Sequence, residues 1–204
     1  SPSKEVRDGG VRYLSDIVRK IAVMGGELFS GVTYAGWGVP AYFVGEKEKK
    51  DMFSRSVESM RQVMRTAEKE GVTVCCEAVN RFESALINTA EEALEYADAV
   101  GSERIGVHLD TYHMNIEENS IGDAIRKAGK RLQHFHTGEV FGALRDIGYE
   151  HDIVSEPFLM LGDEVGYDIR VWRNIMENPD EKRLDEGAKE LRDFTTGMCV
   201  KYGL

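Results

Sequence analysis

Cysteine, basic charge and long hydrophobic runs are all scarce in this sequence, and each shortage removes a class of protein. The chain has three cysteines in 204 residues, with Cys75 and Cys76 adjacent and Cys199 near the C-terminus. This number and spacing do not build a disulfide framework, so we expect reduced structural thiols. Because neighbouring residues of a strand face opposite sides, one of Cys75 and Cys76 should point toward a helix and the other away from it.

The charge balance is acidic, with 36 Asp and Glu against 26 Lys and Arg and a net charge of -10. Such a chain binds a polyanion poorly, which argues against a nucleic-acid partner and favours neutral or cationic ligands. No apolar run approaches the roughly 20 residues that cross a bilayer, and the first residues, SPSKEVRDGG, do not resemble a signal peptide. We therefore predict a cytoplasmic protein without a membrane partner.

Helical and strand patterns alternate along the chain, which is typical of a parallel α/β architecture. Five short apolar runs predict strands: GELFSGV, VTVCCE, IGVHLD, LQHFHT and DIVSE. Amphipathic or helix-favouring stretches predict helices at about residues 6–23, 46–70, 91–100, 122–128, 168–175 and 181–202. Thr89 followed by Glu92 fits a capping box for the helix at 91–100, with Asn88 as the alternative cap.

These elements indicate an α/β fold of the TIM (β/α)8 barrel type, forming a single domain over residues 1–204. A complete barrel has eight strands and about 250 residues, and five strands cannot close one. An open half-barrel would leave unpaired strand edges and an exposed core. We therefore expect that the sequence lacks the first βα units and, near residues 139–141, the loop and helix that should follow the seventh strand.

Four of the five predicted strands end in a side chain that can bind a metal ion. The steps between these residues are 33, 26 and 20 positions, about the length of one strand plus one helix. The carboxyl ends of barrel strands converge on one rim, so the four side chains should meet there. Three carboxylates and one imidazole form an oxygen-rich site for a divalent metal. The candidate ligands are Glu77, Asp110, His136 and Glu156.

The neighbours of these residues carry a specific resemblance. The segments CCEAVNRFE, INTAEEA, HLDTYHMNIEE, HFHTGE and SEPF resemble the D-tagatose 3-epimerase and D-psicose (D-allulose) 3-epimerase family, which belongs to the xylose isomerase-like barrels. The resemblance implies Mn²⁺ or Co²⁺, with Mg²⁺ as an alternative, held by the four candidate ligands. It also implies that Glu83 and His113 hold the O1 and O2 end of a free ketose, and that the enzyme is a homodimer or homotetramer.

Epimerisation at C3 of a ketose requires that a proton leave beside the C2 carbonyl and return on the opposite face. A single base returns the proton to the face it came from, so two carboxylates on opposite sides of C3 are needed. Glu77 and Glu156 are the candidates for this role, while Asp110 and His136 only hold the metal. The metal would polarise the carbonyl and stabilise the enediolate. The expected reaction interconverts free ketohexoses such as D-fructose and D-psicose, or D-tagatose and D-sorbose.

Two features of the sequence concern the walls of the sugar pocket. Trp37, in the segment YAGWGVP, is a candidate substrate-binding wall for the far end of the sugar, with a structural aromatic as an equal alternative. After HFHTGE the family carries a basic loop with an Arg that contacts the substrate, and this chain has no counterpart. The residues that set sugar preference are therefore only partly present.

Three other functions fit parts of the pattern. A related aldose–ketose or hydroxypyruvate-type isomerase would move a proton between C1 and C2 on the same scaffold. An apurinic endonuclease shares the barrel but holds several metals with more histidines than the five in this acidic chain. A non-catalytic binding protein would not need both acid/base carboxylates. No cluster of Lys and Arg lies near the motifs to hold a phosphate, which favours a free sugar.

Overall fold

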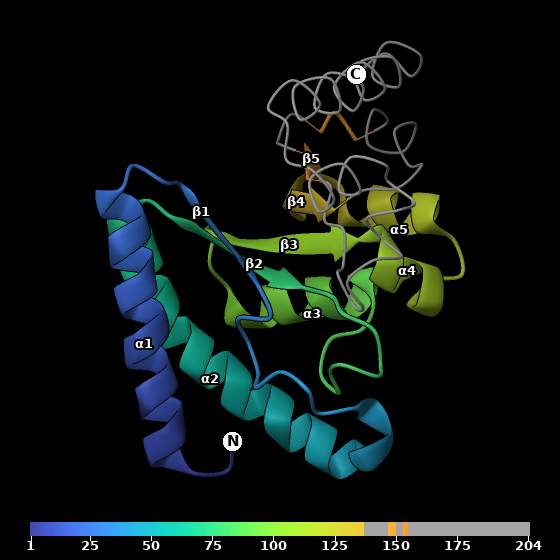
Figure 1. Ribbon diagram of the computed structural model, residues 1–204, viewed down its shortest axis with the longest axis horizontal. Coiled ribbons are helices and arrows are strands. Elements are labelled where there is room, and N and C mark those ends of the chain that lie inside the picture. The colour runs from blue at the N-terminus through green and yellow to red at the C-terminus, as the bar shows by residue number, and fades with distance from the viewer. Residues whose placement is uncertain (137–146, 150–152, 155–204) are drawn as a thin grey trace, which may run out of the picture. The chain divides into compact units, whose positions relative to one another are not determined.

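The computed structural model describes residues 1–136, 147–149 and 153–154, which lie in one compact unit, Ser1–Val154. Within this range five parallel strands form one sheet, in the order in which they occur along the chain (Figure 1). The strands are β1 (Leu28–Gly31), β2 (Thr73–Glu77), β3 (Ile105–Asp110), β4 (Leu132–His136) and β5 (Ile153–Val154). All five predicted strands are confirmed. The helices predicted at 168–175 and 181–202 lie outside the described residues, and the single domain stays a prediction.

One helix precedes β1, and the others lie between successive strands as far as β4. The helices are α1 (Lys4–Val23), α2 (Glu46–Glu70), α3 (Ala90–Val100), α4 (Thr111–Glu117) and α5 (Ile121–Ala128), with short 3-10 turns η1 (Ala41–Phe43) and η2 (Gly129–Arg131). In Figure 1, α2 and α3 run beneath the strands, and α1 packs against α2. Four of these helices match the predicted ranges within two residues, and α4 was not predicted.

The start of α3 shows how the sequence sets a helix boundary. The Thr89 side chain accepts a hydrogen bond from the backbone N–H of Glu92 at 3.2 Å. The Glu92 carboxylate in turn accepts from the backbone N–H of Asn88 at 2.7 Å. Thr89 is therefore the cap, as predicted, and Glu92 reaches one residue further back than in a standard capping box. Gly101 ends the helix with φ of 74°, a conformation that glycine adopts without strain.

Strands β2, β3 and β4 have two chemically different faces. The helix face is the side that packs into the apolar core, and it carries Val74, Cys76, Val107, Leu109 and Phe135. The site face is the opposite side, and it carries Cys75, Glu77, His108, Asp110, His134 and His136. The two faces follow from the alternation of side chains along a strand.

The adjacent cysteines confirm this alternation. The Cys76 thiol lies 3.9 Å from the carbonyl oxygen of Ala93 in α3, so it faces the helices. Cys75 lies on the other side, where a Cβ at Gly106 of β3 would come within 2.8 Å of its sulfur. Gly106 is therefore required by close packing, because any side chain there would collide with Cys75. Both cysteines are buried and free of disulfides.

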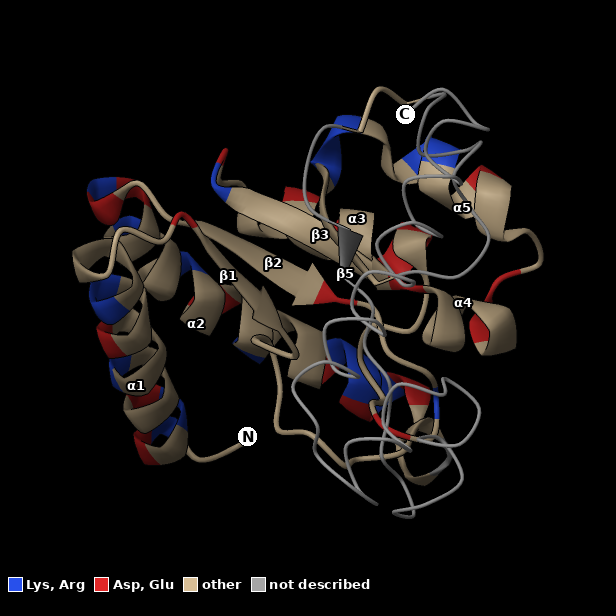
Figure 2. Ribbon diagram, turned by 45° about the horizontal axis from the view of Figure 1, so that its top comes forward, with Lys and Arg blue, Asp and Glu red and all other residues tan. Residues whose placement is uncertain are grey.

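Charge is distributed in keeping with this layering. Figure 2 shows charged residues of both signs along α1 and α2, whereas the strands are uncharged over most of their length. In the described ranges, none of the helices has the length and apolarity that a membrane crossing requires. Parallel pairing brings the carboxyl ends of β2, β3 and β4 to one edge of the sheet, and the charged ends of these strands gather there.

Candidate active site and metal centre

Three of the four predicted metal ligands converge. Glu77, Asp110 and His136 are the last residues of β2, β3 and β4, and one ligand atom from each lies within 4.8 Å of the others. Asp110 and His136 are paired in the strand register, and the Nδ1 atom of His136 lies 3.2 Å from Oδ2 of Asp110. Glu156, the fourth predicted ligand and second predicted catalytic carboxylate, lies outside the described residues.

Asp110 divides its two carboxylate oxygens between structure and site. Oδ1 accepts a hydrogen bond from the backbone N–H of Tyr112 at 2.7 Å, which caps α4. Oδ2 faces His136. Capping fixes the orientation of the carboxylate, so Asp110 is held in a single geometry for binding. The residue that marks the start of α4 in the sequence is therefore Asp110, its N-cap. The same residue was predicted only as a metal ligand.

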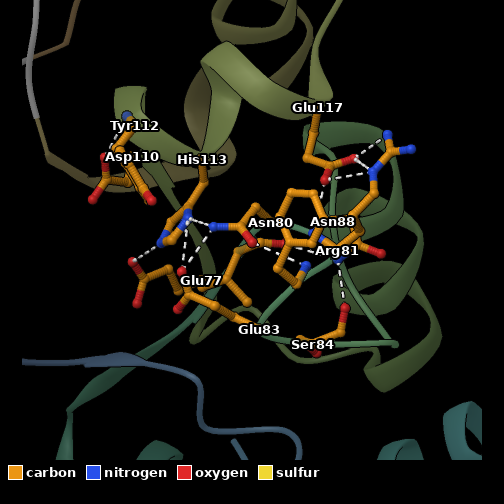
Figure 3. Close-up of polar contacts among 12 residues, drawn as sticks. Glu77, Asn80, Arg81, Glu83, Ser84, Asn88, Asp110, Tyr112, His113 and Glu117 are labelled. Carbon is orange, nitrogen blue, oxygen red and sulfur yellow. Dashed lines mark hydrogen bonds and ion pairs between the residues drawn. The ribbon is translucent and has the colours of Figure 1, made fainter. Parts of the chain in front are cut away.

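His113 and Glu83, predicted to bind substrate, lie beside Glu77 (Figure 3). His113 projects from α4 and is buried, with Nε2 at 3.8 Å from Oε1 of Glu77. Its Nδ1 lies 3.8 Å from Oε1 of Glu83, and both groups contact the side-chain amide of Asn80. The two predicted residues thus form one polar cluster next to the candidate metal ligands.

Trp37 contacts the same polar cluster through its indole nitrogen. Its indole Nε1–H donates to Oε2 of Glu83 at 3.1 Å, and 69% of the residue is exposed. The structure therefore gives Trp37 a contact with a predicted substrate-binding residue. Its role as an apolar wall for the sugar stays a prediction.

The loop after β2 is held against α4 by a bidentate ion pair. The guanidinium group of Arg81 donates to both carboxylate oxygens of Glu117, with the closest contact at 2.7 Å. The backbone N–H of Arg81 also donates to Glu117 at 2.7 Å. Burial alone would raise the pKa of Glu117, but the hydrogen bonds from Arg81 outweigh burial and lower it. This pair holds the loop that carries Glu83 against the helix that carries His113.

A second group of possible metal ligands consists of three histidines on the site face. His108, His134 and His136 offer nitrogen atoms within 4.8 Å of one another. His108 is buried, its Nδ1 lies 2.9 Å from the Ser30 hydroxyl, and it is 3.6 Å from Oε2 of Glu77. Burial lowers the pKa of His108, and the neighbouring histidines lower it further. Sequence reasoning missed His108 and His134, although the patterns H-x-D and H-x-H place them on the ligand side of their strands.

The carboxylate-bearing group fits the predicted metals, Mn²⁺, Co²⁺ or Mg²⁺, better than the histidine group does. Glu77, Asp110 and His136 offer two charged oxygens and one nitrogen at the open end of the strands, which suits Mn²⁺, Co²⁺ or Mg²⁺. The three histidines offer nitrogen atoms without an oxygen, which suits these metals less well, and His108 is nearly inaccessible. The donor set at the strand ends therefore agrees with the predicted metal centre.

Comparison with known proteins gives the class of the molecule. A family model described as xylose isomerase-like TIM barrel matches residues 1–192, and the chain belongs to this family. The five parallel strands described above are part of that barrel fold. The fold prediction is confirmed.

Within this family, similar proteins identify the enzyme class of the chain as epimerase. D-psicose 3-epimerase of Ruminiclostridium cellulolyticum is 40% identical over 219 residues, covering 99% of this chain and 74% of the relative. L-ribulose 3-epimerase of Mesorhizobium japonicum is 35% identical, covering 86% of this chain and 63% of the relative. A crystal structure of D-psicose 3-epimerase with D-tagatose from Clostridium cellulolyticum H10 superposes with a TM-score of 0.80, covering 97% of this chain and 73% of that one. The chain is an isomerase of the 3-epimerase family, as its motifs predicted.

Proposed function

We propose that this protein is a metal-dependent ketose 3-epimerase that acts on free ketohexoses such as D-fructose and D-psicose, or D-tagatose and D-sorbose. The observation that carries the proposal is the convergence of Glu77 with Asp110 and His136, beside the cluster of Glu83 and His113. A base next to two ligand side chains and a substrate-holding pair is the arrangement that proton removal beside a carbonyl needs. The names of the relatives support the same reaction.

The metal centre of the proposal consists of Glu77, Asp110, His136 and Glu156, with Mn²⁺ or Co²⁺ as the metal and Mg²⁺ as the alternative. When bound, the metal would polarise the substrate carbonyl as a Lewis acid. Asp110 is already fixed by its cap to α4, and His136 by its contact with Asp110. These two residues have a positional role in the proposal.

The proton transfers of the proposal fall to two carboxylates. Glu77 serves one face of C3, and Glu156, which the sequence places at the end of the last predicted strand, serves the other. His113 holds a substrate oxygen next to the reacting carbon in this proposal, which the direction of its Nε2 toward Glu77 supports. Glu83 is fixed by two donors and holds the neighbouring hydroxyl.

Isotope labelling tests the proposed reaction. The protein is incubated with Mn²⁺ in D₂O and assayed on D-fructose, D-psicose, D-tagatose and L-ribulose, with Glu77→Gln as the inactive control. Deuterium at C3 of product is expected, because the proton removed from one face exchanges with solvent. Label at C1 of the recovered ketose or at C2 of an aldose product, with none at C3, would assign the protein to the aldose–ketose isomerases and overturn the proposal. The proposed partner of the protein is a free ketose. The homodimeric or homotetrameric state and the cytoplasmic location stay predictions.

A further inference from the structure

Asn80 lies at the centre of the polar cluster in Figure 3, although neither the metal pattern nor the predicted substrate contacts include it. It sits in the loop after β2 and is 1% exposed. Its Oδ1 accepts a hydrogen bond from the backbone N–H of Phe82 at 3.0 Å. Its Nδ2 contacts Oε1 of Glu83 at 2.7 Å and Nδ1 of His113 at 2.9 Å.

These contacts fix the orientation of the Asn80 amide. A backbone N–H can only donate, so the atom that faces Phe82 must be the amide oxygen. The opposite atom is then the NH₂ group, which supplies one hydrogen to the Glu83 carboxylate and the other to His113. A flipped amide would place its oxygen against the Glu83 carboxylate and its NH₂ against the Phe82 N–H, losing the hydrogen bonds to both of these groups.

The fixed amide determines the tautomer of His113. Because Asn80 donates to Nδ1, this nitrogen must carry the lone pair, and the ring proton must be on Nε2. Nε2 is the atom that points toward Glu77, at 3.8 Å from Oε1. His113 therefore presents an N–H donor on the side where the metal ligands converge.

The same amide fixes Glu83. Oε1 of Glu83 accepts from Asn80, and Oε2 accepts from the indole N–H of Trp37, so each carboxylate oxygen has a protein donor. The backbone oxygen of Asn80 also accepts from the N–H groups of Glu83 and Ser84, which closes the turn between them. Asn80 thus connects two of the three predicted substrate-binding residues, Glu83 and His113, through one side chain.

We propose that Asn80 is a positioning residue that holds His113 in its Nε2–H tautomer and orients Glu83 for the substrate. This inference rests on the proposed function for its kinetic consequence, but the tautomer is a property of the protein alone. A hydrogen bond at one ring nitrogen also fixes the tautomer and orientation of histidines in other enzymes, although there the partner accepts from the ring and here Asn80 donates to it. Asn80 acts through His113 and Glu83 and makes no substrate contact of its own in this proposal.

Nitrogen NMR tests the tautomer directly. Protein labelled with ¹⁵N-histidine, metal-free and again with diamagnetic Mg²⁺, is examined by long-range ¹H–¹⁵N correlation, and the His113 signals are assigned with His113→Gln. The wild-type protein should show a protonated Nε2 and an unprotonated Nδ1. A proton on Nδ1 in the wild type would overturn the proposal whether or not the enzyme is active, and this measurement needs no Asn80 variant to fold.

Asn80→Asp has nearly the same shape but replaces the donor with an acceptor. The His113 proton should move to Nδ1, and kcat should fall by about 10- to 100-fold, the range for loss of a residue that orients a ligand histidine. In a His113→Gln background the same substitution should cost less than in the wild type, because only the contact with Glu83 remains to be lost. An equal cost in both backgrounds, with an unchanged tautomer, would show that Asn80 is merely structural.

Asn88 provides the matched control. It is another buried amide in the same loop, and its Nδ2 donates to the backbone oxygens of Val79 and Ser84, without a contact to His113 or Glu83. Asn88→Asp should lower thermal stability and leave the protonated nitrogen of His113 at Nε2. A shift of the tautomer in Asn88→Asp as large as in Asn80→Asp would contradict the proposal. Wild-type protein with the expected tautomer but no C3 exchange would contradict the proposed function only.

Discussion

The helix face and the site face of β2, β3 and β4 are built from alternate residues of the same strands, yet they have opposite chemistry. Leu109 on the helix face is fully buried in the apolar core, and Phe135 is packed in the same way. Their immediate neighbours Asp110 and His136 face the other side and converge with Glu77. A displacement of one residue along the strand thus separates a packing position from a ligand position.

This difference indicates that alternate residues of one short strand contribute separately to the stability of the fold and to the chemistry of the site. The helix face gains free energy by removing apolar surface from water, which does not depend on the metal. The site face gathers carboxylates and imidazoles, which repel or desolvate one another unless an ion or hydrogen bonds compensate them. Substitutions on the two faces should therefore have separable effects. Three substitutions test that separation, and a fourth experiment tests the burial of the adjacent cysteines.

Glu77→Gln should have the largest effect. The amide cannot accept the proton from C3, and loss of a positioned base costs about 10²- to 10⁴-fold in kcat. The melting temperature of the metal-free protein should not fall, because the substitution removes one of several clustered acidic groups. Steady-state kinetics and thermal melting measure both quantities. Retention of more than a tenth of the wild-type kcat would contradict the role of Glu77.

Asp110→Asn should weaken metal binding while it keeps the fold. Asparagine still accepts from the Tyr112 N–H and caps α4, but it has lost the charge that faces the cation. We expect Kd for Mn²⁺ to rise by about 100-fold, equivalent to roughly 2.7 kcal/mol. Isothermal titration of metal-free protein measures this change. An unchanged Kd would remove Asp110 from the metal centre.

Leu109→Ala should lower stability and leave metal binding unchanged, which is the opposite of the effect expected for Asp110→Asn. Loss of the buried side chain leaves a cavity, and the free energy of unfolding should fall by about 2–5 kcal/mol. The kcat of the folded protein and the Kd for Mn²⁺ should stay within about twofold of wild type. Urea unfolding of Leu109→Ala beside Asp110→Asn gives the comparison. Equal destabilisation of the metal-free forms of both variants would show that the two faces do not separate.

The smallest expected effect is the slow reaction of the two buried thiols, Cys75 and Cys76. Burial raises the pKa of Cys76 to about 12, and burial likewise raises the pKa of Cys75 well above its usual range. Because the thiolate is the reactive form and forms only near or above the raised pKa, neither should react with a disulfide reagent at pH 8. At most one thiol per folded chain, Cys199, should react quickly, and all three after denaturation. Fast reaction of two thiols in the folded protein would disprove the burial of this pair.

The parts of the fold that local patterns determine were predictable. Strand alternation and the spacing of strand ends placed Glu77, Asp110 and His136 correctly, because parallel strands bring such residues to one edge. The seven-residue helix α4 was missed because it is too short for a clear helical period, and because its cap is also a ligand candidate. The role of Asn80 could not be predicted, since its contact with His113 joins residues 33 positions apart.

The predicted gap near residues 139–141 depends on residues outside those described. The alignment with the D-psicose 3-epimerase extends over 219 residues, more than the 204 of this chain, so that relative has interior residues without a counterpart here. This agrees with an interior segment absent from the sequence. The position of the absent residues stays a prediction.

Anomalous diffraction from crystals soaked in Mn²⁺ would locate the metal ion among the candidate ligands. His136 belongs to both candidate groups, so the position of the ion distinguishes them. We expect one peak at the strand ends, within coordination distance of Glu77, Asp110 and His136. A peak enclosed by His108, His134 and His136, or no peak at saturating Mn²⁺, would contradict this expectation.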